Sequence, residues 1–295
     1  MEKNFNVDGV TIEQSSTGLS FVNIKTKYCT CAITTNGAHV TEFTPTGEKP
    51  VLWMSQSSNL TLNSALRGGV PVCAPWFGPA PVEGRPNHGI VRTQIWEIEE
   101  ISQLVGGAIK VVMTLDSSNI DKALYDWSFK ATMTIIAADT LEMTLSFTNT
   151  DTKEGIFTGA LHTYFGVSNI DNVTVKGLTN HTYEDKVPGA IQTSGVLQNG
   201  DITVASEVDR VYQPAFGSTY LVDSGYNRVI RVDKTGSGST VVWNPWIEKS
   251  KKMPDFGDLE YKEMICIEAA IALKDARKIA PNTTITLSQK LSVEK

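Results

Sequence analysis

The fold class is decided by residues 141–148, which read Leu-Glu-Met-Thr-Leu-Ser-Phe-Thr. Apolar residues occupy every second position, and polar residues fill the positions between them. Successive side chains of a β-strand point to opposite faces of the sheet, so this stretch predicts a strand with one buried face. The same alternation recurs in residues 109–115, 129–135 and 285–291, which predicts several half-buried strands around one core.

Turn residues separate these runs, as at Gly-Gly 106–107 and Asn-Gly 199–200. Helical periodicity is scarce, and only residues 119–125 and 258–263 could hold a turn or two of helix. The chain has no internal repeat, low-complexity tract or linker. We therefore predict an all-β fold, a large antiparallel β-sandwich with few short helices, and a single domain over residues 1–295.

Charge and composition exclude several classes of protein. Lys and Arg number 26 against 32 Asp and Glu, a formal net charge of −6 that disfavours nucleic acid as a partner. The start lacks the apolar core of a signal peptide, and no apolar run is long enough to span a membrane. Four cysteines do not make a disulfide framework, and we expect buried thiols. We expect a cytoplasmic monomer without a membrane partner.

The Gly- and Pro-rich stretch 67–92 carries two arginines, Arg67 and Arg92, together with Asn87 and His88. Walker-type loops, a G-x-S-x-G turn and metal-ligand spacing of the histidines are absent from the sequence. A pair of arginines can grip a cluster of anionic oxygens through forked hydrogen bonds. The alternative, favoured for each arginine taken alone, is a surface ion pair with a carboxylate.

The second informative segment is Gly-Ala-Leu-His-Thr-Tyr-Phe-Gly at 159–166. A strand over 157–165 would place Ala160, His162 and Tyr164 on one face. An imidazole beside a phenol there could donate a proton in a cleft. A hydrogen-bonded core histidine is the alternative, and the segment alone favours it.

The third segment places Met264, Cys266 and Glu268 on one face of a strongly apolar strand. A carboxylate there is costly unless it is paired or lies at an open end, and burial raises its pKa toward that of a useful base. A structural salt bridge is an equally weighted alternative. Tryptophans offer faces that stack on sugars, although in a sandwich they are more often core: Trp53, Trp76, Trp243 and Trp246.

Taken together, these segments resemble the hexose-6-phosphate mutarotases, the glucose-6-phosphate 1-epimerase branch of the galactose mutarotase-like superfamily. The resemblance covers most of the chain and implies that family's β-supersandwich fold. Six blocks in the family's order carry it: Arg67-Gly-Gly-Val-Pro71, Pro86-Asn-His-Gly-Ile-Val-Arg92, Leu161-His-Thr-Tyr-Phe165, Glu207-Val-Asp-Arg-Val-Tyr212, Val241-Val-Trp-Asn-Pro-Trp-Ile-Glu248 and Met264-Ile-Cys-Ile-Glu268.

The resemblance implies an isomerase that interconverts the α and β anomers of a hexose 6-phosphate without a metal or other cofactor. By motif, His162 matches the family's general acid and Glu268 its general base. Mutarotation requires one base and one acid that face each other across a sugar and exchange roles as the ring recloses.

The resemblance also implies a set of substrate-binding residues. Arg67 and Arg92 match the pair associated with the phosphate, and Asp209 matches a carboxylate that binds sugar hydroxyls. Asn87 and His88 match polar positions of the same site. The sequence leaves open which hexose phosphate is preferred.

Three alternatives remain open at this point. An aldose 1-epimerase for unphosphorylated sugars would not need the pair Arg67 and Arg92. A non-catalytic sugar-phosphate-binding module would not need His162 and Glu268 together. Glycoside hydrolysis needs two suitably spaced carboxylates, which Asp209 and Glu268 could imitate.

Overall fold

Antiparallel strands dominate the computed structural model, which describes residues 5–125 and 127–294. Each of the four alternating runs falls within one strand, and buried residues alternate along these strands with more exposed ones. The all-β prediction is therefore confirmed. The predicted domain, 1–295, includes residues 1–4, 126 and 295, which lie outside the described residues.

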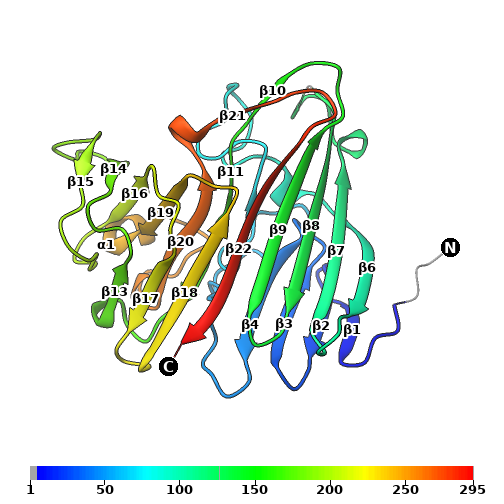
Figure 1. Cartoon of the computed structure of the whole chain (residues 1–295), viewed down its shortest axis with the longest axis horizontal. Helices are drawn as coiled ribbons and strands as arrows, with labels where there is room; N and C mark the ends of the chain where they lie inside the picture. The colour runs from blue at the N-terminus through cyan, green and yellow to red at the C-terminus, as the bar shows by residue number, and fades with distance from the viewer. Residues whose placement is uncertain (1–4, 126, 295) are drawn as a thin grey trace.

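An eight-stranded antiparallel sheet, here called the long sheet, crosses the molecule (Figure 1). The side chains on its inward face, such as Val111, Met133 and Leu145, belong to the main hydrophobic core. In spatial order its strands are β13 (Val173–Lys176), β17 (Thr219–Asp223), β18 (Arg228–Thr235), β22 (Thr284–Glu294), β9 (Leu141–Asn149), β8 (Phe129–Ala137), β7 (Ile109–Asp116) and β6 (Glu97–Gln103).

A second eight-stranded sheet, here called the site sheet, lies behind the long sheet at the left of Figure 1. Its order is β15 (Val196–Leu197), β14 (Thr182–Asp185), β16 (Val208–Tyr212), β19 (Ser239–Asn244), β20 (Met264–Ile271), β11 (Gly159–Leu161) and β5 (Val72–Cys73), with β12 (Tyr164–Gly166) also paired to β20.

Strand β20 is buried on both faces, which explains its continuous apolar sequence. Ile265 and Ile267 belong to the main core that the two large sheets enclose. Met264 and Cys266 belong to a separate aromatic cluster on the opposite face, and Glu268 shares their parity. The strand therefore presents a carboxylate on the face that points away from the main core.

The remaining strands form two smaller sheets, and helices are short. A four-stranded sheet contains β1 (Val10–Gln14), β2 (Ser20–Lys25), β3 (Cys29–Thr34) and β4 (His39–Pro45), and β10 (Gly155–Phe157) pairs with β21 (Arg277–Ile279). Within residues 5–125 and 127–294, the α-helix is α1 (Trp246–Ser250), and the 3₁₀ turns are η1 (Val91–Thr93), η2 (Ser117–Asn119), η3 (Ile170–Asn172), η4 (Glu260–Lys262) and η5 (Leu273–Asp275).

Helical turns occur near the two predicted places and at others that the sequence did not indicate. Turn η4 lies within 258–263, whereas η2 ends where the predicted stretch 119–125 begins. Helix α1 is too short for a periodic pattern, and its start is fixed by Asn244, whose side-chain oxygen accepts a hydrogen bond from the Trp246 amide at 2.9 Å. None of the helices in the described part of the chain has the length and apolarity needed to cross a bilayer.

The predicted strand over 157–165 is interrupted at Thr158, between β10 and β11, and again at His162 and Thr163, between β11 and β12. The reason for the second interruption is a local bend: the Thr163 amide donates to the Leu161 carbonyl at 3.0 Å, and the His162 amide donates to the Pro71 carbonyl at 3.0 Å. The predicted division of faces nevertheless holds, because Leu161 lies in the main core whereas Tyr164 lies in the aromatic cluster.

Candidate active site

A cavity of about 510 Å³ lies over the face of the site sheet that points away from the main core. Strands β12, β16, β19 and β20 contribute side chains to it, and the stretch 67–88 closes one side. Five of the residues predicted from sequence line it: Arg67, His88, His162, Asp209 and Glu268. The fold thus gathers segments that lie far apart in the chain.

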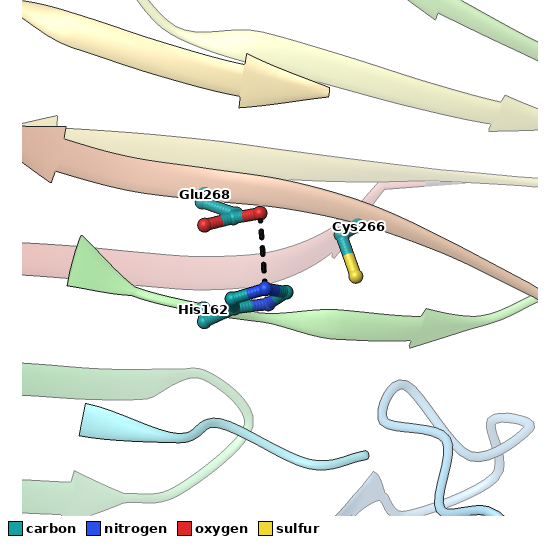
Figure 2. A group of neighbouring side chains, drawn as sticks. All are labelled: His162, Cys266 and Glu268. Carbon is teal, nitrogen blue, oxygen red and sulfur yellow. Dashed lines mark ion pairs between the residues drawn. The ribbon is translucent and has the colours of Figure 1, made fainter. Parts of the chain in front are cut away.

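His162 and Glu268 form the closest acid–base pair of this cavity (Figure 2). The His162 Nε2 atom lies 3.4 Å from the Glu268 Oε1 atom. The side chain of His162 is 11% exposed and that of Glu268 is 1% exposed. The bend at 162–163 and strand β20 therefore hold both groups at the cavity wall, nearly out of contact with bulk water.

Burial favours the uncharged form of each member of the pair. Desolvation lowers the pKa of His162 well below its ordinary value, and the nearby His88 adds to this. Desolvation raises the pKa of Glu268 well above its ordinary value, and the charge of Asp209 acts in the same direction. Transfer of the carboxylic proton from Glu268 to His162 would convert this neutral pair into a carboxylate and an imidazolium, the forms that act on a substrate as general base and general acid.

His88 is held as a neutral hydrogen-bond donor beside this pair. The Gly78 amide donates to its Nδ1 atom at 3.4 Å, so the ring proton lies on Nε2. Burial lowers the pKa of His88 to about 3, and its ring centre lies 5.8 Å from that of His162. Gly89 fixes the loop behind it, because at φ +73° a Cβ there would lie 1.9 Å from the Ala74 carbonyl oxygen.

The Arg67 guanidinium is fixed in orientation by two partners. Its Nε and Nη2 atoms each donate to Asp255 at 3.2 Å, and Nη1 donates to the Tyr164 hydroxyl at 2.9 Å. These contacts use three of the five guanidinium N–H groups, which leaves one on each terminal nitrogen for other partners. The Tyr164 hydroxyl and Asp255 raise the pKa of Arg67, so this group stays cationic at the cavity wall.

Asp209 enters the cavity from β16 beside a lysine. The Lys249 Nζ atom lies 2.7 Å from the Glu207 carboxylate and 3.5 Å from the Asp209 carboxylate. Burial raises the pKa of Asp209, and the charge of Lys249 opposes this shift. Lys249 therefore supports the ionised form of Asp209, which can accept hydrogen bonds from sugar hydroxyls.

Arg92 and Asn87 lie next to each other but outside the described cavity lining. The Arg92 Nη2 atom donates to the Asn87 backbone carbonyl at 3.0 Å. Its charge still reaches the site, because it contributes to the lowered pKa of His88. Direct contact of Arg92 or Asn87 with a substrate stays a prediction.

The aromatic residues divide between core and cavity. Trp243 lines the cavity, and its ring centre lies 5.9 Å from that of Tyr164. Trp53 and Trp76 are buried, in agreement with the core alternative, and the Trp76 indole donates to the Pro86 carbonyl at 2.9 Å. Trp246 packs against Tyr261 outside the described lining.

Sequence reasoning missed several residues of this site. Lys249 directly follows a block already singled out, so its position was available as a signal. Asp255 had no such signal, because it lies 188 positions from its partner Arg67. Strand parity places Tyr164 beside His162, but nothing in the local sequence connects its hydroxyl to Arg67.

Comparisons with known proteins agree with this geometry. The chain matches the family described as "Aldose 1-epimerase" over residues 20–292. It is 34% identical over 261 residues to the Escherichia coli (strain K12) protein named "Putative glucose-6-phosphate 1-epimerase", covering 88% of this chain and 85% of that protein. A protein of Cenchrus ciliaris with the same name is 34% identical over 256 residues, covering 83% and 76%.

A crystal structure from Salmonella typhimurium described as "a putative mutarotase" superposes with a TM-score of 0.90 at 30% identity. The match covers 98% of this chain and 95% of that chain. Because the family match extends over most of the chain and includes all the segments that build the cavity, this chain belongs to the aldose 1-epimerase family.

Proposed function

We propose that this enzyme interconverts the α and β anomers of a hexose 6-phosphate, with glucose 6-phosphate as the first substrate to test. The observation that carries the proposal is that His162 and Glu268 lie side by side, 3.4 Å apart, in the wall of a cavity of about 510 Å³. A pyranose cannot lie between them, contrary to the expectation from the sequence, so the sugar would meet both groups from the cavity side. This volume lies within the range of small-molecule sites. The names of the relatives support the choice of substrate.

The proposed reaction is a pair of proton transfers. In the ion-pair form, the Glu268 carboxylate takes the proton of the anomeric hydroxyl while the His162 imidazolium gives a proton to the ring oxygen, and the bond between C1 and the ring oxygen breaks. The open-chain aldehyde rotates about C1–C2. Ring closure then reverses both transfers on the other face of the carbonyl, so the two side chains return to their starting protonation states.

The remaining polar groups of the cavity would bind and orient the sugar. Asp209 accepts hydrogen bonds from hydroxyls, and His88 donates from Nε2. Arg67 presents its two remaining N–H groups to the phosphate, and Arg92 adds positive charge nearby. The overall charge of −6 repels a phosphate dianion, so binding depends on this local positive charge.

The phosphate assignment predicts a selective loss. Arg67→Ala should lower kcat/KM for glucose 6-phosphate at least about tenfold more than kcat/KM for glucose, because only the phosphate loses a charged partner. Arg92→Ala should act in the same direction with a smaller effect. Exchange NMR between the anomeric protons, with each sugar offered separately, measures both ratios.

Arg231→Ala provides the matched control, since Arg231 forms an ion pair with Asp233 on the long sheet. It should leave the ratio of the two specificity constants unchanged. Equal losses for both sugars in Arg67→Ala would remove the phosphate role from Arg67.

One observation favours a second candidate, an aldose 1-epimerase for unphosphorylated sugars. The fork of Arg67 is already engaged with Asp255, which would suit a purely structural arginine. The same two-sugar experiment decides, because this candidate predicts faster turnover of glucose than of glucose 6-phosphate. Release of reducing sugar from glycosides would indicate hydrolysis instead, and binding without any anomer exchange would indicate a non-catalytic module.

A further inference from the structure

The thiol of Cys266 lies beside the acid–base pair, so three side chains that can each bind a metal ion lie close together. Cys266 and Glu268 are two positions apart on β20 and point from the same face of that strand toward the His162 imidazole (Figure 2). A nitrogen of His162, the Cys266 sulfur and a carboxylate oxygen of Glu268 all lie within 4.8 Å of one another.

This spacing is close to that of a metal site with three protein ligands. Three atoms within 4.8 Å of one another share a point no more than about 2.8 Å from each, and zinc bonds to nitrogen, oxygen and sulfur measure roughly 2.0–2.3 Å. Small side-chain rotations would shorten the distances from this point to the three ligand atoms to the length of zinc bonds. Sites with three protein ligands leave a fourth position open, and here His162 and Glu268 line the cavity through which an ion would enter.

A second observation points to an unfilled coordination position. The Oε2 atom of Glu268 is buried and has no hydrogen-bond partner among the described residues. A buried carboxylate oxygen without a partner is costly, and a cation beside it would remove that cost. The mixture of imidazole, thiol and carboxylate suits zinc better than calcium or magnesium, which prefer oxygen ligands alone.

We propose that His162, Cys266 and Glu268 form a binding site for zinc or a similar thiophilic divalent ion, and that its occupation inhibits the enzyme. The ion takes the lone pairs of the imidazole and the carboxylate, and the thiol and the carboxyl group of Glu268 release their protons to solvent on binding. Metal binding does not depend on the proposed epimerase reaction. The inhibitory consequence does rest on it.

Cobalt substitution tests the site without any activity measurement. Titration of the metal-free enzyme with Co²⁺ should produce a near-ultraviolet thiolate-to-cobalt absorption band at one ion per chain, and Zn²⁺ should displace it. The band should vanish in Cys266→Ser, which retains the size of the side chain. Cys73→Ser is the matched control, since Cys73 is also a buried free thiol and should leave the band intact.

Inhibition supplies the second measurement. Zn²⁺ should inhibit wild-type anomer exchange reversibly, with chelator restoring full rate, and Cys266→Ser and Cys266→Ala should each raise the inhibitory concentration at least about tenfold relative to their own uninhibited rates. Thermal melts of both variants show whether they fold. A missing cobalt band, a band that survives Cys266→Ser, or stimulation by Zn²⁺ would each overturn the proposal. If the chain exchanges no anomers, the cobalt titration still decides whether the metal site exists.

Discussion

Glu268→Gln should lower kcat for anomer exchange by roughly 10²–10⁴-fold, the usual contribution of one positioned acid or base. The amide keeps the shape of the side chain but cannot accept the anomeric proton. KM should change little, because the variant removes basicity and leaves the cavity walls in place. Exchange NMR with glucose 6-phosphate measures both constants.

The control for this variant is Glu142→Gln, which makes the same chemical change where Glu142 pairs with Lys290 on the surface of the long sheet. It should retain the wild-type rate. Glu268→Gln should also remain folded, since an amide loses less hydration than a carboxylate on burial. Wild-type turnover in a folded Glu268→Gln enzyme would show that another group is the base.

His162→Asn should lower kcat by a similar factor, roughly 10²–10⁴-fold, because the amide cannot donate and recover the ring-oxygen proton. Some loss of stability is expected as well, since the imidazole stacks on Tyr164 with ring centres 4.8 Å apart. Comparison of kcat at a temperature where the melting curve shows a fully folded variant separates the two effects.

The double variant of His162→Asn and Glu268→Gln tests whether the two groups act together. Residues that work as one unit show strongly non-additive losses, so the double variant should be little slower than the slower single variant. His181→Asn is the control for His162→Asn, because it makes the same change outside the described cavity lining and should leave kcat unchanged. If the fold losses in kcat of the two single variants multiply in the double variant, the two side chains act independently and do not form one proton-transfer pair.

Local patterns in the sequence predicted most of the fold. Burial alternates along strands β7, β8 and β9 because one face meets the core and the other faces water, and the sequence follows this alternation with exceptions such as Val112 and Ile136. Strand β20 was recognisable from its continuous apolar residues, and the cost of a carboxylate among them singled out Glu268. His162 followed from its place on a strand face and from the family resemblance.

Contacts between distant segments could not be predicted in the same way. The bend at 162–163 depends on a hydrogen bond from His162 to Pro71, which no local pattern encodes. The ion pair between Arg67 and Asp255 likewise depends on the fold as a whole. A sequence pattern identifies which groups are costly to bury, whereas the identity of their partners emerges only from tertiary packing.

Strand β22 has a consequence for biosynthesis. It lies in the middle of the long sheet between β9 and β18, and its Gln289 accepts a hydrogen bond at 2.8 Å from Thr163, the neighbour of His162. A nascent chain therefore cannot join the two halves of this sheet until residues 284–294 have left the ribosome. Until then β9 and β18 each expose an unpaired edge, so chaperones that shield such edges should matter until β22 has paired with both strands.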